Sequence, residues 1–144
     1  MLADQILERK GRDVATIGPD APVRVALESL RDANVGALVV LTEAGALAGI
    51  VSERDIVRHL AGAGEALLDA PVTSIMQATV HTCVGSDNVD DLMHRMTEHR
   101  IRHLPVVDGE VVVGVISIGD VVKTHVDDLE HERAQLVDYI RTGR

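Results

Sequence analysis

The sequence predicts an α/β (α+β) fold in which two tandem βαββα repeats are related by pseudo-twofold symmetry and a C-terminal amphipathic helix follows. Three observations carry this prediction. The 144-residue chain matches itself at an offset of 66 residues, each copy mixes helical periodicity with short apolar runs, and both copies end in the same motif. The hairpin turn of the second copy is one residue shorter, so the offset between matched residues is 65 from there on. Matched pairs include Val23 with Val89, Leu38 with Leu104, Gly49 with Gly114, Ser52 with Ser117 and Asp55 with Asp120.

The first copy begins with a strand expected over Val14–Ile17, which turn residues close at 18–20. Apolar residues then recur at three- and four-residue spacing from Val23 to Ala33, the pattern of a half-buried helix. The apolar runs 37–41 and 47–51 predict two buried strands joined by a hairpin. A helix is expected to follow from about Glu53 to Leu60.

The second copy repeats this order, and a short lead-in segment precedes each copy, at 2–7 and at 71–76. Its expected elements are a strand over 80–84, a helix through 89–96, strands over 104–107 and 111–116, and a last helix from about Gly119. We place the first repeat at 8–66 with a lead-in helix over 1–10, the second at 71–127, and the C-terminal helix at 125–141. Because neither copy is long enough to close a core alone, the two sheets are expected to pack on each other as one globule.

The composition is that of a globular protein, with 46% hydrophobic and 26% charged residues. A net charge of −9 argues against nucleic acid as a partner, because non-specific binding needs many cationic contacts to phosphate. The single Cys83 excludes an internal disulfide, and it aligns with a buried strand position, where a small core residue is expected rather than a nucleophile. We find no signal peptide and no apolar run long enough to cross a membrane, and expect a soluble cytoplasmic protein.

The repeated motif is Gly-apolar-apolar-Ser-x-x-Asp, found at 49–55 and again at 114–120. In each copy a strand would run into a helix whose first free amides are capped by Ser, with Asp at the third helical position, near the positive end of the helix dipole. A capping box without any ligand explains one such pair. Two copies at matching points of a repeat also suit a carboxylate that accepts hydrogen bonds from a ribose diol.

The paired repeat, the two motif endings and the segment IRHLPVVD at 101–108 resemble a tandem CBS-domain module, also called a Bateman module. The resemblance covers about residues 2 to 125. More specifically, the chain is similar to small stand-alone bacterial proteins made of one CBS pair. It implies a non-enzymatic regulatory protein that binds an adenosine-containing ligand, such as AMP, ATP or NAD(H), between the repeats and takes part in energy sensing and signal transduction. No cofactor is required on this interpretation.

The resemblance also implies where the ligand would bind, because sites in this family are built crosswise from the motif of one repeat and the first two strands of the other. One site would then contain Ser52, Asp55, Val80, Thr82, Arg102 and His103. The other would contain Ser117, Asp120, Thr16, Ile17, Gly36 and Ala37.

The two sites are predicted to be unequal. Arg102 and His103 would place cationic donors beside Asp55, and charge-assisted hydrogen bonds to phosphate are strong. Their counterparts Gly36 and Ala37 have no side-chain donor or positive charge for a phosphate. We therefore expect a phosphorylated nucleotide at Asp55, and at Asp120 a weaker site, an empty one or one for a less charged adenosine compound. The alternative for Arg102 and His103 is a solvated strand edge, with Arg102 paired to a carboxylate.

Other function classes find less support in the sequence. We find none of the common nucleophile, P-loop or dinucleotide-binding motifs of enzymes. A metal site would have to use His94, His99 and His103, and the expected strand start breaks any shared helix face. The remaining alternative is a ligand-free dimerisation or interaction scaffold whose C-terminal helix binds an unknown protein partner. A homodimer through helical faces, which the family resemblance implies, is compatible with both readings.

Overall fold

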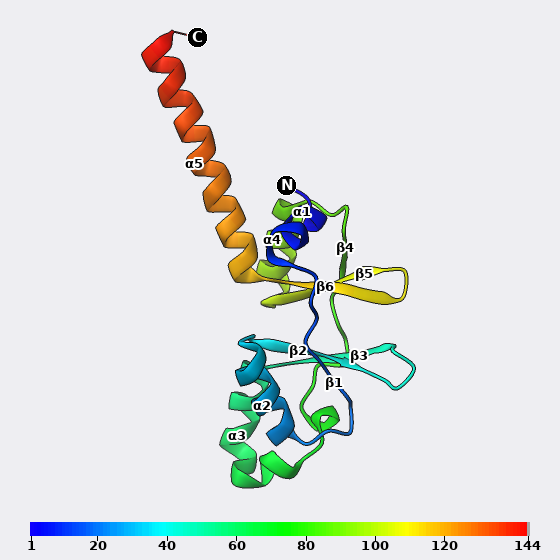
Figure 1. Cartoon of the computed structure of the whole chain (residues 1–144). Coiled ribbons are helices and arrows are strands. Elements are labelled where there is room, and N and C mark those ends of the chain that lie inside the picture. Colours follow the sequence, from blue (N-terminus) through cyan, green and yellow to red (C-terminus); the bar gives the residue numbers. More distant parts are fainter. Residues whose placement is uncertain (144) are drawn as a thin grey trace.

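The computed structural model describes residues 1–143 and has two lobes, each made of a three-stranded sheet with helices on its outer face (Figure 1). In the first lobe the elements are β1 (Thr16–Ile17), α2 (Val23–Ala33), β2 (Ala37–Leu41), β3 (Leu47–Ser52) and α3 (Glu53–Ala63). β2 lies between β1, its parallel neighbour, and β3, its antiparallel neighbour. The strand, helix, hairpin and helix expected for the first repeat are confirmed.

The second lobe repeats this topology with β4 (Cys83–Val84), α4 (Val89–His99), β5 (His103–Asp108), β6 (Val111–Ser117) and α5 (Ile118–Thr142). The strand expected over 80–84 forms only at its last two residues, since pairing with β5 begins at Cys83. The corresponding glycines Gly49 on β3 and Gly114 on β6 occupy the same register, opposite Val40 and Val106 of the central strands. The fold class and the tandem repeat are therefore as the sequence predicts.

The two sheets face each other between the helix layers, because the central strand of each sheet is buried on both sides (Figure 1). Along β2, Leu38 and Val40 join the core of their own lobe, while the alternate residues Ala37 and Val39 are also buried but belong to neither core. Each lobe nevertheless has a separate cluster of buried side chains. Neither repeat closes its core alone, as the sequence predicts, because a connecting segment completes each core.

These connecting segments cross between the repeats. α1 (Ala3–Lys10) precedes the first repeat in sequence, but Ala3, Ile6 and Leu7 are buried in the core of the second. Conversely, the segment with η2 (Val72–Ser74) precedes the second repeat and packs on the first, where it buries Val72 and Ile75. The structure therefore corrects the assignment of the lead-in helix to the first repeat, because this helix packs in the core of the second. Each core is thus completed by a segment that precedes the other repeat in the sequence.

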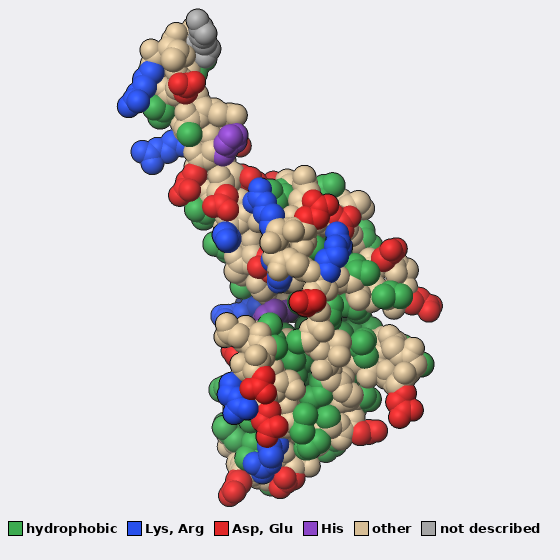
Figure 2. Space-filling view, viewed as in Figure 1, with side chains coloured by type: hydrophobic (Ala, Val, Ile, Leu, Met, Phe, Trp, Pro, Cys, Tyr) green, Lys and Arg blue, Asp and Glu red, His purple; other side chains and the backbone are tan. Residues whose placement is uncertain are grey.

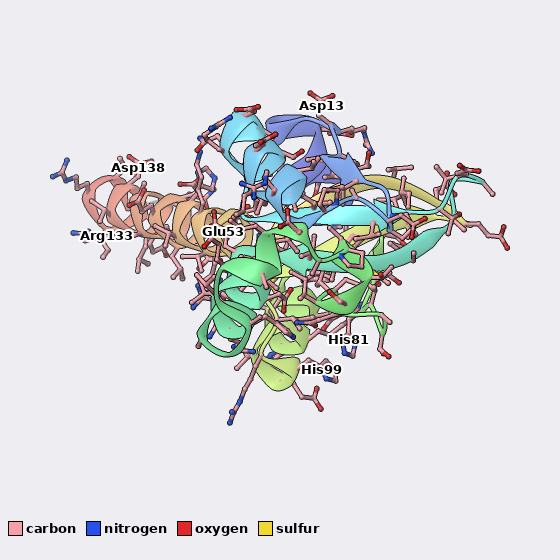
Figure 3. All side chains as sticks on the ribbon, turned by 90° about the horizontal axis from the view of Figure 1, so that it is seen from below. Asp13, Glu53, His81, His99, Arg133 and Asp138 are labelled. Carbon is pink, nitrogen blue, oxygen red and sulfur yellow. The ribbon has the colours of Figure 1, made fainter. Side chains whose placement is uncertain are left out.

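α5 is one continuous helix of 25 residues, so the last helix of the second repeat and the C-terminal helix are not separate elements. The helix packs on the second lobe only through its first turns, where Val121 and Thr124 are buried. Every described residue from His125 onwards is exposed, and the helix projects from the body with apolar side chains on its surface (Figure 2). Seen from below, Arg133 and Asp138 stand well clear of both lobes (Figure 3).

Candidate functional site

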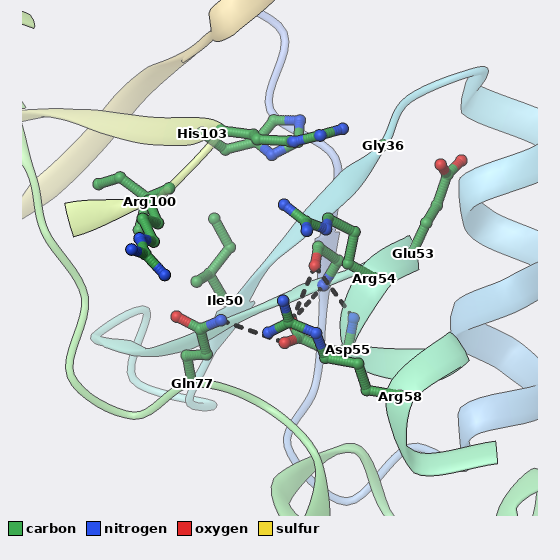
Figure 4. A pocket seen from close by; sticks show the side chains of 12 residues that line it. Gly36, Ile50, Glu53, Arg54, Asp55, Arg58, Gln77, Arg100 and His103 are labelled. Carbon is green, nitrogen blue, oxygen red and sulfur yellow. Dashed lines mark hydrogen bonds between the residues drawn. The ribbon is translucent and has the colours of Figure 1, made fainter. Parts of the chain in front are cut away.

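A cavity of about 120 Å³ lies between the two lobes, at the point where β3 runs into α3 (Figure 4). The first repeat contributes the end of β3 and the first turns of α3, and the second contributes the segment from the end of α4 into β5. The lining residues are Gly36, Ile50, Ser52, Glu53, Arg54, Asp55, Arg58, Gln77, Arg100, Ile101, Arg102 and His103. The structure therefore brings Ser52 and Asp55 together with Arg102 and His103, as the crossed arrangement predicts.

Asp55 is held at the floor of this cavity by a capping box. Ser52 caps α3: its hydroxyl accepts from the Asp55 amide at 3.3 Å, and its own amide donates to Asp55 Oδ2 at 2.8 Å. The Ser52 hydroxyl also donates to Oδ2 at 2.9 Å. The other oxygen, Oδ1, accepts a single bond of 3.1 Å from Gln77 Nε2. Asp55 thus fulfils the local capping role and still presents one oxygen, held by a neutral amide, to the cavity.

Four guanidinium groups converge on the same cavity. Arg54 and Arg58 lie one turn apart on α3, and Arg100 approaches from the other lobe (Figure 4). Arg102, two residues further along, also lines the cavity. Among the residues that the structure describes, none of the four has a carboxylate oxygen within 4.0 Å, so the pairing of Arg102 with a nearby carboxylate is not seen. Unpaired guanidinium groups that share a concave site suit phosphate, whose oxygens they bind in pairs.

Arg100 has a backbone conformation that L residues seldom adopt. It ends α4 with φ 54° and ψ 42°, in the left-handed region, and its counterpart Asn34 ends α2 with φ 52°. Asn tolerates this conformation better than most residues, whereas Arg has no such local advantage. Strain of this kind is found at functional sites, and here it directs a cationic side chain into the cavity.

His103 lies opposite Asp55, but it is not the cation that the sequence suggests. Burial and the nearby Lys10 ammonium hold the pKa of His103 below its ordinary value, against the opposing effect of Asp120 and Glu53. The imidazole is therefore neutral at pH 7 and acts as a hydrogen-bonding group. The ring lies so close to Gly36 that a Cβ there would be 3.3 Å from Nε2, and Gly36 also lines this cavity.

Asp120 has a different environment from Asp55. Ser117 caps α5 as Ser52 caps α3, with 2.8 Å from the Ser117 amide to Asp120 Oδ2. The same carboxylate oxygen also accepts a 2.7 Å bond from Lys10 Nζ. Burial alone would raise the pKa of Asp120, but hydrogen bonds from Lys10 and Ser117 outweigh it and the pKa lies below its ordinary value. The carboxylate is charged and already paired.

The remaining predicted site residues do not line the cavity. Ile17 is part of the first core, Thr16 is exposed on β1, and Ala37 is buried on the face of β2 that meets the other lobe. Val80 and Thr82 lie in the connection before β4, where the Thr82 carbonyl accepts from Arg95. Thr16, Ile17 and Ala37 are predicted for the Asp120 site, so their place there stays a prediction. Val80 and Thr82, predicted for the Asp55 site, precede the two-residue strand β4 and are not among the lining residues.

Sequence reasoning missed Arg54, Arg58, Arg100 and Gln77. Arg58 could have been found, because it lies three residues after Asp55 and therefore on the same helix face, and Arg54 lies one turn before Arg58. Arg100 and Gln77 lie at element ends whose direction depends on the tertiary fold. Cys83 is 2% exposed, and burial raises the pKa of its thiol to about 11, which fits the core role predicted for it.

The other histidines form no cluster with metal-ligand geometry in residues 1–143. His81 and His99 instead stack with ring centroids 4.1 Å apart (Figure 3). No helix within the described part of the chain is long and apolar enough to span a membrane.

The fold is a paired-repeat α/β module. Its two sheets face each other with a polar cavity between the lobes, and each core is completed by the lead-in segment of the other repeat. The chain belongs to the CBS-domain family, whose model matches it twice, over residues 8–62 and 72–127. The CBS-domain protein ATU1752 from Agrobacterium tumefaciens is 42% identical and superposes with a TM-score of 0.85 over 87% of this chain and 99% of its own. The mitochondrial CBS domain-containing protein CBSX3 of Arabidopsis thaliana is 38% identical over 86% of this chain, which spans 62% of the plant protein's length.

Two similar structures contain adenosine compounds. The CBS-domain protein PAE2072 from Pyrobaculum aerophilum, complexed with AMP, is 29% identical with a TM-score of 0.75 over 83% of this chain and 89% of its own. The CBS domain pair of protein MJ0100, complexed with 5′-methylthioadenosine and S-adenosyl-L-methionine, is 26% identical with a TM-score of 0.80 over 89% of this chain and 98% of its own. Relatives with this fold therefore bind adenosine-type ligands.

Proposed function

We propose that this protein is a non-enzymatic regulatory protein that binds a phosphorylated adenosine ligand in the cavity beside Asp55. The observation that carries the proposal is the convergence of four arginines from both repeats, none with an ion-pair partner within residues 1–143, on a cavity whose floor is a capped carboxylate. The AMP complex of the Pyrobaculum relative supports the ligand class. Such a protein would report the level of an adenine nucleotide in the cell, and the cytoplasm is the compartment we propose for it.

Each part of the ligand has a chemical counterpart in the cavity. The ribose diol would donate to Asp55, taking the place of the single Gln77 bond. The phosphate would lie among the guanidinium groups, with the neutral His103 as a further donor. Ile50 and Ile101 offer apolar surface to the base. Because a ligand held in this way touches both lobes, it would favour one angle between them over others, to the extent that it binds that arrangement more tightly.

A thermal-shift panel tests the proposal. AMP, ADP, ATP, NAD, NADH and S-adenosylmethionine are added to the wild type, to Asp55→Asn and to Asp120→Asn, and each melting temperature is compared with that of the same variant without ligand. A ligand at about 100 times its dissociation constant adds roughly 2.7 kcal/mol to the free energy of unfolding. We expect AMP, ADP or ATP to raise the melting temperature of the wild type and of Asp120→Asn, and to lose that effect in Asp55→Asn. No rise with any compound would favour the ligand-free scaffold instead.

The projecting part of α5 favours a second feature of the proposal, self-association. Exposed apolar side chains recur along it at four- and three-residue steps, the spacing of a coiled-coil seam, at Val122, Val126, Leu129, Leu136 and Ile140, with Arg133 completing the series. A helix of this length without tertiary contacts is marginal in water. A second copy of the helix would cover the seam.

We therefore expect the wild type to sediment as a dimer and the double variant Leu129→Glu, Leu136→Glu to sediment as a monomer at the same concentration. Val111→Glu, an exposed apolar position on β6, is the matched control and should leave the dimer intact. Analytical ultracentrifugation gives the mass in each case. A double variant that remains dimeric would place the contact on other helical faces of the lobes, and a monomeric wild type would remove the dimer from the proposal.

A further inference from the structure

We propose that Lys10 is an internal occupant of the Asp120 site, which keeps a nucleoside diol out of it, so that each chain binds one adenosine ligand rather than two. The inference rests on the proposed function in that it takes the two motif carboxylates as the diol-binding groups. On this inference Lys10, at the end of α1, determines which of the two sites binds the ligand.

The internal repeat supplies the comparison. In the first lobe, Gln77 bonds through its backbone amide to the Ile50 carbonyl at 2.9 Å and through its side chain to Asp55 Oδ1 at 3.1 Å. In the second lobe, the Lys10 ammonium donates to the Val115 carbonyl at 2.8 Å and to Asp120 Oδ2 at 2.7 Å, the carboxylate oxygen that the Ser117 amide also bonds. Val115 and Asp120 are the counterparts of Ile50 and Asp55 at the repeat offset. The motif carboxylate is thus bonded by a neutral amide in one lobe and by a cation in the other.

This difference changes what a ligand must displace. A diol that binds Asp55 exchanges one neutral hydrogen bond for its own. A diol that binds Asp120 competes with an ion pair whose two side chains are 36% and 22% exposed, and a neutral diol does not replace the positive charge that Lys10 places beside the carboxylate. Hydrogen bonds from Lys10 and Ser117 hold the pKa of Asp120 below its ordinary value, against the effect of burial. This is consistent with a carboxylate that already has hydrogen-bond donors from its own chain.

Lys10 is held in this position by the packing of α1. Leu7 lies one turn before Lys10, is fully buried and contacts Gly114, where an added Cβ would lie 2.7 Å from the Leu7 methyl carbons. Because Gly114 directly precedes Val115, the contact fixes the end of α1 beside the carbonyl that Lys10 bonds. The ammonium is therefore positioned by the core of the second lobe and is not a freely mobile surface group.

The test is the binding stoichiometry of adenosine and of AMP, measured by isothermal titration calorimetry. Lys10→Gln gives the second lobe the side-chain type of Gln77. We expect one equivalent of AMP for the wild type, two for Lys10→Gln, and one again for Lys10→Gln combined with Asp120→Asn. Lys123→Gln changes the other lysine of the chain, exposed on α5, and should behave as the wild type.

The other outcomes would contradict either the role of Lys10 or the proposed site at Asp55. A Lys10→Gln protein that still binds one equivalent, or a wild type that binds two and loses one on Asp120→Asn, would overturn the role of Lys10. If the wild type binds nothing but Lys10→Gln binds adenosine in a manner that requires Asp120, the inference stands and the proposed site at Asp55 fails. If neither protein binds adenosine or AMP, both fail. Unchanged melting of ligand-free Lys10→Gln, within a few degrees, shows that the variant is folded.

Discussion

Affinity for adenosine ligands should rise with the number of phosphate charges, with AMP bound at least about tenfold more tightly than adenosine and ATP more tightly than AMP. The reason is that Arg54, Arg58, Arg100 and Arg102 face the cavity without ion-pair partners among the described residues. A hydrogen bond to a charged group contributes about 1.5–3 kcal/mol, which corresponds to roughly a tenfold to hundredfold change in affinity. Titration calorimetry of the four ligands adenosine, AMP, ADP and ATP at fixed salt measures the order.

Arg100→Asn separates this electrostatic effect from structural damage. Arg100 has φ 54°, and its counterpart Asn34 shows that Asn is accommodated at the equivalent helix end. The variant should therefore be as stable as the wild type or slightly more stable, while its affinity for AMP falls about tenfold and its affinity for adenosine stays unchanged. Arg31→Gln, an exposed arginine paired with Asp32 on α2, is the control and should change neither. Equal loss for AMP and adenosine would show that Arg100 does not contact phosphate.

Salt provides an independent check on the same arginines. Screening weakens interactions of exposed charges, and these side chains are all exposed at the mouth of the cavity. The advantage of AMP over adenosine should shrink as ionic strength rises, and it should shrink less in Arg100→Asn, where one of the charges has already been removed. An advantage that does not depend on salt would argue that the phosphate is not bound by these guanidinium groups.

The parts of the fold that follow from local pattern were predictable. The stripe over 23–33 and the run over 37–41 coincide with α2 and β2, because helical periodicity and β-branched runs are written directly in neighbouring residues. The capping pair Ser52 and Asp55 was predictable for the same reason, since both partners lie within one turn. The crossed pairing of Asp55 with Arg102 came from the family resemblance, and the cavity is consistent with it.

The parts that depend on where a segment packs were not predictable from pattern. α1 and the η2 segment look like lead-ins to the repeats that follow them, yet each is buried in the other lobe's core, a choice that no short-range signal contains. Lys10 and Gln77 reach the two carboxylates only because of that exchange. Arg100 enters the cavity because α4 ends in a left-handed residue, and the sequence at that point shows neither Gly nor Asn.

Leu7→Ala should be among the most destabilising single substitutions in the chain, although Leu7 lies far in sequence from the lobe it supports. The side chain is fully buried among residues of the second core and contacts Gly114 on β6. Truncation of a buried leucine to alanine costs about 2–5 kcal/mol. For a domain of this size, a loss of about 3 kcal/mol should lower the melting temperature by roughly 10 °C.

The location of the damage distinguishes the exchanged packing from a simple N-terminal lead-in. Hydrogen exchange should show lost protection in the amides of β4, β5 and β6, with little change in β1, β2 and β3, because α1 completes only the second core. Leu2→Ala, at the exposed start of the same helix, is the matched control and should cost less than about 1 kcal/mol. If Leu7→Ala instead loosened the first sheet, α1 would belong to the repeat that follows it. The same variant should also displace Lys10 from Asp120, because the helix that carries the ammonium is anchored through Leu7.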